Sequence, residues 1–317
     1  MLSKKPWRRD DSVNNTKPVE LWRMNAFTDK PFSGNPAGVV LDGDYLSDQQ
    51  MQLIAPQLNS ISETVFICSA NSPSADLRLR YFTSTIEVDL CGHATISALF
   101  ALAASGRIKG GNETRKLKAQ TRVGVLDLDL EFVDGRLVWA SMTQPVPKHQ
   151  LPSAPELATA LLGLDPSAVR NDLPIACAST GIWSCYVPLV DLDALAAITI
   201  DHALIESLWP ENQELCGVYP FVITGRDLQT NSLQTQGRFF CPPKFGISED
   251  PVTGTASGAL AAYLIRYGAM AAADELEAHQ GVEMGSPGRL LIRQTKTGAM
   301  KIRGQAVCIY RGQLTLS

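Results

Sequence analysis

The chain has 317 residues, of which 45% are hydrophobic and 19% charged, and its formal net charge at pH 7 is −4. These values are typical of a globular protein that is long enough for two domains with buried cores. No basic block lies beyond the first ten residues, so nucleic-acid binding is not expected. No 18 apolar residues run together, so the sequence also predicts no membrane association.

Residues 1–17 are polar and lack the apolar core of a secretory signal, so we expect a flexible N-terminal extension on a cytoplasmic protein. The first half of the chain then shows strand and helix patterns in alternation, and Ser47 is placed to cap the first helix. We expect strands at 21–27, 37–41, 64–68 and 77–83, helices at 48–58 and 94–104, and a hairpin of 123–132 with 137–142.

Four prolines within residues 144–155 mark the best linker candidate. Beyond it we expect helices at 155–162, 191–197 and 202–208, and strands within 175–189, 217–224 and 290–309. Long strands and long helices do not alternate, so the pattern favours an α+β fold of two mostly antiparallel lobes over a doubly wound sheet. The expected organisation is an N-terminal lobe at 18–143 joined by 305–317, a linker at 144–156 and a C-terminal lobe at 157–304.

Two stretches half a chain apart look like versions of one unit. Each has an Arg-aromatic-Phe strand, an acidic loop, a glycine and then a small-residue helix that ends at another glycine. Five pairs recur at a spacing of 162 residues, namely Glu87 with Glu249, Gly92 with Gly254, Ala94 with Ala256, Thr95 with Ser257 and Gly106 with Gly268. Recurrence of this kind predicts two similar lobes.

The repeated unit suits the binding of a small anion. Glycine lets the backbone bend closely around a ligand, and Thr or Ser can cap the helix that follows. The first turn of a helix offers N–H groups and a partial positive charge. Two such termini in one cleft would hold a small carboxylate-bearing substrate, although each loop alone could be an ordinary strand-to-helix connection.

Several side chains are candidates for the chemistry. Glu63 lies at the mouth of an apolar strand, where partial burial would prepare it for proton transfer, but its position alone favours an exposed loop acid. His93 could hydrogen-bond a substrate anion or be satisfied by the backbone. Asp250 could cap the second helix or orient substrate. A Cys91–His93 dyad is not expected, because residues two apart at a helix start rarely face each other.

Motifs for bound metals and cofactors are missing from the sequence. There is no H-E-x-x-H, and no G-x-G-x-x-G opens a helix; a Walker loop and a G-x-S-x-G elbow are also absent. The seven cysteines form no C-x-x-C pair and are odd in number, which favours reduced thiols over disulfides or a zinc site. The sequence therefore predicts no cofactor and no metal.

Four motifs together resemble the PhzF (phenazine-biosynthesis-like) family, and the match runs in order from about residue 20 to the C-terminus. They are Asn35-Pro36-Ala37-Gly38-Val39-Val40, Ser62-Glu63-Thr64-Val65-Phe66, the stretch 80–95 and Glu249-Asp250-Pro251-Val252-Thr253-Gly254. The resemblance implies the diaminopimelate-epimerase-like fold, in which two pseudo-symmetric lobes each curl a mostly antiparallel sheet around a central helix and the active site lies between them.

The resemblance also implies cofactor-independent isomerase chemistry on a small carboxylic acid. Glu63 matches the acid/base of the family, and His93, Asp250 and the backbone of Gly92 and Gly254 match its assisting and substrate-binding groups. Gln280 belongs to a later loop that resembles one reaching the cleft in the family, and we also expect Thr95 and Thr255 to bind substrate. Three positions depart from the family pattern: Ser84 replaces a frequent Pro, Thr255 a frequent Ser, and Ser286 a common Arg. The last change puts any anion contact at that loop in doubt.

Our reading is an isomerase whose partner is a small carboxylate, with the question of a homodimer left open. One rival is an epimerase or racemase that uses Cys91 as a base, although Asp250-Pro251-Val252 stands where a second thiol would be. The other rival is a non-catalytic protein that binds a small metabolite. The sequence does not name the substrate.

Overall fold

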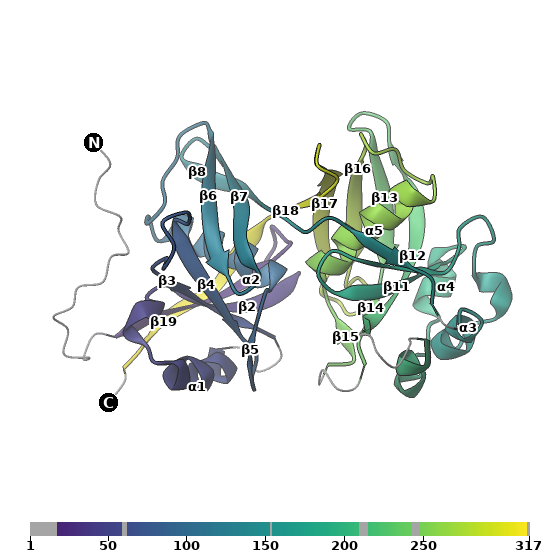
Figure 1. Ribbon diagram of the computed structural model, residues 1–317, viewed down its shortest axis with the longest axis horizontal. Helices are drawn as coiled ribbons and strands as arrows, with labels where there is room; N and C mark the ends of the chain where they lie inside the picture. Colours follow the sequence, from purple (N-terminus) through teal and green to yellow (C-terminus); the bar gives the residue numbers. More distant parts are fainter. Residues whose placement is uncertain (1–17, 59–61, 153, 209–214, 243–246, 316–317) are drawn as a thin grey trace. The chain divides into compact units, whose positions relative to one another are not determined.

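The computed structural model describes residues 18–58, 62–152, 154–208, 215–242 and 247–315 (Figure 1). The flexible extension expected at residues 1–17 lies outside this part of the chain. The chain divides into two compact units, of which unit 1 comprises Met1–Met142 and Gly304–Ser317 and unit 2 comprises Thr143–Arg303. Among the helices of the described residues, none is long and apolar enough to cross a membrane.

Among its described residues, unit 1 is rich in strands and contains two α-helices. Its elements are β1 (Val19–Ala26), β2 (Asn35–Val40), a 3₁₀ turn (Gly43–Tyr45), α1 (Asp48–Leu58), β3 (Thr64–Cys68), β4 (Leu77–Phe82), β5 (Glu87–Val88), α2 (Gly92–Ala104), β6 (Thr114–Thr121), β7 (Gly124–Val133), β8 (Arg136–Thr143) and β19 (Ala306–Leu314).

Unit 2 has the same character and adds short helices. Its elements are β9 (Lys148–Gln150), α3 (Leu157–Leu162), a 3₁₀ turn (Pro166–Ala168), β10 (Ala176–Ser179), β11 (Trp183–Pro188), α4 (Leu192–Ala196), a 3₁₀ helix (His202–Leu208), β12 (Leu215–Asp227), β13 (Ser232–Gly237), β14 (Phe239–Phe240), β15 (Glu249–Asp250), α5 (Gly254–Arg266), β16 (Glu275–Gln280), β17 (Gly288–Gln294) and β18 (Met300–Gly304).

Both units pair their strands in the same order and with the same directions. In unit 1 the order is β19-β1-β2-β3-β4-β6-β7-β8. In unit 2 it is β9-β10-β11-β12-β13-β16-β17-β18. The third and fifth pairings are parallel and the other pairings are antiparallel in each unit, so both sheets are mixed. The short pairs β4–β5 and β14–β15 also correspond.

Each unit packs one small-residue helix against its sheet. Helix α2 lies against β1, β2, β3 and β19, and α5 lies against β10, β11 and β17 (Figure 1). Ala94, Ala98, Ala256 and Ala259 are among the fully buried residues of these helices. Alanine side chains allow a helix to approach a sheet closely, and each larger buried residue such as Leu99 stabilises the fold by about 1.5–3 kcal/mol.

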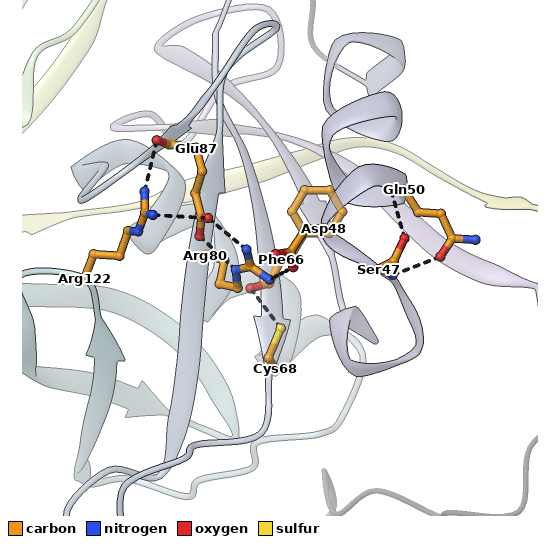
Figure 2. Close-up of polar contacts among 8 residues, drawn as sticks. All are labelled: Ser47, Asp48, Gln50, Phe66, Cys68, Arg80, Glu87 and Arg122. Atoms are coloured by element: carbon orange, nitrogen blue, oxygen red, sulfur yellow. Dashed lines mark hydrogen bonds and ion pairs between the residues drawn. The ribbon is translucent and has the colours of Figure 1, made fainter.

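Helix α1 begins where the sequence predicts and carries the expected cap. The Ser47 hydroxyl accepts a hydrogen bond from the Gln50 N–H at 3.2 Å, and the Gln50 side chain accepts one from the Ser47 N–H at 2.9 Å (Figure 2). This reciprocal arrangement is a capping box, which satisfies two donors of the first turn. The expected helix at 48–58 is confirmed by α1.

Several details differ from the sequence expectations: β6, β13 and β16 were not predicted, and the helix expected at 202–208 is a 3₁₀ helix. Within the segment predicted as a linker, residues 148–150 form β9 and pair with β10, so the prolines interrupt regular structure without excluding a short strand. Thr95 and Ser257 also do not cap the helices that they were expected to cap. Both lie inside the first turn, and their hydroxyls donate back to the carbonyl oxygens of Cys91 and Thr253.

Candidate functional site

Unit 1 brings Glu63 and His93 together next to the start of α2. The His93 Nε2 atom lies 3.4 Å from the Glu63 Oε2 atom. Ser62 connects the two, because its hydroxyl donates to Glu63 Oε2 at 2.9 Å and lies 2.8 Å from His93 Nε2. The Glu63 side chain is 27% exposed and that of His93 10%. Glu63 is therefore neither a solvated loop acid nor a buried core residue.

Cys91 completes this cluster, which corrects the expectation that it and His93 would not face each other. The Cys91 Sγ atom lies 3.3 Å from His93 Nδ1 and 3.7 Å from Nε2. The expectation assumed helical geometry, but Cys91 is the residue before α2 and has extended backbone angles, φ −143° and ψ 116°. The bend between Cys91 and the helix turns the thiol towards the imidazole.

Sequence reasoning assigned no role to Ser62, although it stands beside Glu63 in a family motif. A serine in a loop has many uses, and only the structure shows that this hydroxyl contacts two candidate groups. Glu63, Cys91 and His93 also offer metal-ligand atoms within 4.8 Å of one another. Cysteine, histidine and glutamate are residues that bind zinc, so a divalent metal could compete with the hydrogen bonds of the cluster.

The start of α2 is held from inside the protein. Gly92 is its first residue, and the first intrahelical bond runs from the Thr95 N–H to the Cys91 carbonyl at 3.0 Å. The Thr95 hydroxyl donates to the same carbonyl at 2.7 Å and receives the Tyr81 hydroxyl at 2.7 Å. Burial raises the pKa of Tyr81. This geometry favours a structural role for the Thr95 hydroxyl.

An ion pair anchors the acidic loop that precedes α2. Arg80 on β4 makes two bonds to the Glu87 carboxylate, both 2.8 Å long, and a third to Asp48 at 2.6 Å (Figure 2). Its guanidinium also lies 5.2 Å from the centre of the Phe82 ring. Bidentate pairs fix orientation as well as charge, so this contact holds the loop against the strand. Hydrogen bonding to Glu87 raises the pKa of Arg80.

Unit 2 repeats this anchor at Arg238. Its bonds to the Glu249 carboxylate are 2.8 and 2.9 Å long, and its guanidinium lies 4.7 Å from the centre of the Phe240 ring. The Glu249 bonds raise the pKa of Arg238. Helix α5 then begins at Gly254, as α2 begins at Gly92, and both helices have 13 residues.

Asp250 is fixed by a network around the start of α5. Its Oδ2 atom accepts the Thr253 hydroxyl at 2.5 Å. Gln280 is fully buried and binds both residues: it accepts the Thr253 N–H at 3.0 Å and donates to the Asp250 carbonyl at 2.7 Å. Asp250 was expected either to cap the second helix or to orient substrate. The structure shows that its carboxylate is held by the Thr253 hydroxyl.

Two other predicted residues of unit 2 lie beside this network. The Gly254 carbonyl accepts the Gln144 side-chain amide at 3.0 Å, and the Thr255 carbonyl accepts the Thr180 hydroxyl at 2.9 Å. Their N–H groups belong to the first turn of α5, where backbone donors are available to an anion. Glu63, His93, Gly92 and Thr95 thus belong to unit 1, and the remaining predicted residues to unit 2.

A separate cavity of about 690 Å³ lies in unit 1 around the Arg80 ion pair. Its lining includes Asp44, Asp48, Arg78, Glu87 and Arg122. It borders the Cys68 end of β3, whereas Glu63 precedes the Thr64 end of that strand. The acidic and basic side chains balance in this cavity, so it does not present the net charge that a simple anion site would.

Comparison with known proteins connects these motifs to a family. The family described as phenazine biosynthesis-like protein (PhzC-PhzF) matches residues 24–312. The uncharacterized isomerase YfhB of Bacillus subtilis is 37% identical over 296 residues, which cover 93% of this chain and 97% of that protein. The trans-2,3-dihydro-3-hydroxyanthranilate isomerase of Pseudomonas aeruginosa is 31% identical over 301 residues, covering 92% and 98%.

Solved structures agree with this assignment. A PhzF-family phenazine biosynthesis protein from Bacillus anthracis matches with a TM-score of 0.80 and 32% identity, covering 95% of this chain and 100% of that one. A probable proline racemase from Agrobacterium radiobacter matches with a TM-score of 0.61 and 15% identity, covering 94% and 93%, which shows a shared fold alone. The fold is therefore that of the racemases and epimerases. The two relatives described above are named isomerases. The chain belongs to the phenazine biosynthesis-like (PhzF) family.

Proposed function

We propose that this protein is a cofactor-independent isomerase of a small carboxylic acid and that Glu63 transfers the proton. The observation that carries the proposal is the Glu63 carboxylate, part-exposed and held 3.4 Å from His93 Nε2 at the start of α2. The relative from Pseudomonas aeruginosa acts, by its name, on trans-2,3-dihydro-3-hydroxyanthranilate, which is itself a small carboxylic acid. That name supports the substrate class and leaves the substrate of this chain open.

In this proposal the substrate binds in the cleft that the family resemblance implies between two pseudo-symmetric lobes. The N–H groups of the first turns of α2 and α5, from Gly92 and from Gly254 and Thr255, bind its carboxylate. Glu63 removes a proton from carbon and returns it at another position, while His93 and Asp250 bind and orient the polar groups. Gln280 keeps Asp250 and Thr253 in place.

The test is a screen of small carboxylic and amino acids incubated with the protein in D₂O and followed by proton NMR. We expect one class of acids to lose a C–H signal as deuterium enters. Glu63→Gln should lower that rate by about 10²–10⁴-fold, because a positioned acid/base contributes that much. Glu113→Gln, an exposed acid of the same unit, is the matched control. Ligands that stabilise the protein without any exchange would instead identify a binding protein.

A second candidate is an epimerase or racemase in which Cys91 acts as a base. The contact of 3.3 Å between its sulfur and His93 Nδ1 favours it, since a neighbouring imidazole helps a thiol to ionise. This candidate predicts rapid inactivation by thiol alkylation and inversion of a stereocentre in the D₂O screen. A protein that is alkylated at Cys91 and keeps its full rate would exclude it.

A further inference from the structure

We propose that the cavity around Arg78 in unit 1 is a second binding site, which takes a small zwitterion of the amino-acid class. The cavity has a volume of about 690 Å³, which is within the range of small-molecule sites. All its lining residues belong to unit 1, and neither Glu63 nor His93 is among them. The site is therefore separate from the Glu63 contacts, and its existence does not depend on the proposed isomerase activity.

Three neighbouring strands of the unit 1 sheet bring the key side chains together. Arg78 on β4 pairs in register with Cys68 on β3 and with Gln120 on β6. Register partners point to the same face of a sheet, so the guanidinium lies between the thiol and the amide. Arg80 lies on the same face, two residues further along β4. One wall of the cavity therefore carries two arginines and an amide.

The charges at the Arg80 end of the cavity are already paired with one another (Figure 2). Arg80 bonds to Glu87 at 2.8 Å and to Asp48 at 2.6 Å. Arg122 also faces Glu87, with 3.9 Å between its Nη2 atom and the Oε2 atom of the carboxylate. Because each charge here has an opposite neighbour, a charged ligand would gain little at this end.

Arg78 differs from these side chains because it has no acid of its own. Its Nε atom is buried and forms no hydrogen bond, and no carboxylate of the described residues forms an ion pair with it. The hydrogen bond from Arg80 is the main cause of the lowered pKa of Asp48, to which the Arg78 charge adds. Burial raises the pKa of the Cys68 thiol to about 11, so the thiol stays neutral and does not compensate the guanidinium. A cation partly removed from water is stabilised by a bound anion.

Unit 2 shows which group occupies the equivalent place there. Arg80 of unit 1 corresponds to Arg238 of unit 2, 158 residues further along the chain. The same spacing places Gln236 where unit 1 has Arg78. The Gln236 amide donates to the Glu283 carboxylate at 2.7 Å. Unit 2 thus supplies a carboxylate of its own to this position, whereas unit 1 offers a guanidinium that a ligand carboxylate can bind.

Gln120 provides a second donor for that carboxylate. Its side-chain oxygen accepts two backbone N–H groups, at 2.9 and 3.1 Å, and this orients the amide. No described residue accepts a hydrogen bond from its NH₂ group, which is therefore left to donate beside Arg78. A guanidinium and an amide side by side match the two oxygens of a carboxylate.

Asp44 provides an acceptor for a positively charged group of the ligand. Its Oδ2 atom accepts the Ser69 N–H at 2.8 Å and the Ser69 hydroxyl at 2.6 Å, while its Oδ1 atom has no partner among the described residues. Besides burial, the charges of Asp44 and Arg78 both act on the Cys68 thiol, so the two charged groups lie near one residue. A ligand with a carboxylate and an ammonium group therefore matches the balanced charge of the cavity.

The first test follows the arginine Nε–H signals by ¹H–¹⁵N NMR while common L-amino acids are added one at a time at millimolar concentration. Arg78→Gln, which introduces the residue of unit 2, assigns the Arg78 signal by its loss. We expect at least one amino acid to shift this signal and to saturate. Its N-acetyl and methyl ester derivatives each keep one charge and should bind about tenfold more weakly or less. A panel without any shift, or an N-acetyl derivative that binds equally well, would overturn the proposal.

The second test measures the affinity of variants for that amino acid by isothermal titration. Arg78→Gln and Asp44→Asn should each weaken binding about tenfold or more, whereas Arg136→Gln, at an exposed arginine of β8, is the matched control. If Arg78→Gln does not fold, Asp44→Asn decides alone, and unchanged binding would overturn the site. Glu63→Gln should bind as the wild type does, and a loss there would place the ligand at Glu63 instead. An empty D₂O screen would end the proposed function and leave this site standing.

Discussion

The loop–helix segments at 80–106 and 238–268 share one frame and present different chemical groups. Both begin with an arginine that binds a glutamate through two bonds and packs on a phenylalanine ring. Both helices have 13 residues and end in the same way, with a glycine at positive φ: Gly106 at 73° and Gly268 at 77°. The N–H groups of Gly106 and Gly268 bond to equivalent carbonyls one turn back, those of Ala103 and Ile265.

The difference lies at the helix starts. Unit 1 has Cys91 and His93 in contact with Glu63 through Ser62, all groups that can gain or lose protons. Unit 2 has Thr253 and Thr255 at the corresponding positions, with Asp250 held by a hydroxyl and a buried amide. The two units therefore share one frame, but the helix start of unit 1 carries ionisable side chains and that of unit 2 carries hydroxyls and a carboxylate held in place.

The largest expected effect separates His93 from Thr255, which occupy equivalent places after the two glycines. His93→Ala should lower the rate of deuterium exchange by about 10²-fold, because it removes the group next to Glu63. Thr255→Ala should lower it by less than about tenfold, because the carbonyl that accepts Thr180 remains. The test measures the deuterium-exchange rate of both variants in D₂O, with thermal unfolding as a check that each variant folds. Equal losses of rate would mean that the starts of α2 and α5 contribute equally to the reaction.

The next effect probes the rigidity assigned to unit 2. Gly281 has φ +81°, and a Cβ there would lie 2.5 Å from the Ser286 carbonyl oxygen and 2.6 Å from that of Pro251. Gly281→Ala should therefore destabilise the protein by about 2–4 kcal/mol through strain and overpacking. Gly285→Ala, at φ +69° in open space, should cost only about 1 kcal/mol. Urea unfolding measures the free energy of unfolding of both variants. Similar losses would show that the backbone around Gly281 and Pro251 can move to accept a side chain.

A third comparison concerns the two arginine anchors. Arg80 binds Glu87 and Asp48, whereas Arg238 binds Glu249 and the Leu195 carbonyl. Glu249→Gln removes the carboxylate that is hydrogen-bonded to Arg238 at a position 13% exposed, so a loss of about 1–3 kcal/mol in the free energy of unfolding is expected. Glu87→Gln should cost less, because Asp48 still compensates Arg80. Adding Asp48→Asn to Glu87→Gln should remove this compensation and lower the free energy of unfolding further. A double variant as stable as Glu87→Gln alone would refute the explanation.

The sequence predicted the frame well because local rules determine it. Apolar periodicity and Ser47 set α1, Asp134 and Gly135 set the β7–β8 turn with φ values of 49° and 77°, and the repeated glycines set the starts of α2 and α5. The residues alone made Glu63 and His93 candidates and the family resemblance implied a role for each, but neither predicted that the two side chains are in contact. Their contact joins two loops 30 residues apart, which no local rule encodes.

The predictions that were wrong depend on the backbone conformation of single residues at the helix starts. The contact between Cys91 and His93 was rejected on helical spacing, although Cys91 precedes the helix in extended conformation. A helix was expected at 94–104, but α2 starts at Gly92, so Thr95 lies inside the first turn and its hydroxyl donates to the Cys91 carbonyl; Ser257 in α5 makes the same bond to the Thr253 carbonyl. A helix boundary moved by two residues changes which face a side chain occupies, and sequence patterns do not determine boundaries that closely.

The smallest effect tests the second partner of Arg80. The hydrogen bond from Arg80 holds the pKa of Asp48 below its ordinary value of 3.8. A carboxylate with a lowered folded pKa contributes stability that is complete above the unfolded pKa and is lost as pH falls through the folded pKa. The Asp48 side chain is 81% exposed, so we expect Asp48→Asn to cost only about 0.2–1 kcal/mol at pH 7, as for other exposed ion pairs.

Because the contribution of Asp48 disappears in acid, the wild type and Asp48→Asn should converge in stability as the pH falls below 3.8. Salt should narrow the gap at pH 7, since exposed charges are screened. A ¹³C titration of the Asp48 carboxyl gives its pKa directly, with Asp29, an exposed acid of the same unit, as the internal reference. An Asp48 pKa at or above 3.8 would remove the asymmetry between the two anchors, and the loss in Glu87→Gln should then equal that in Glu249→Gln.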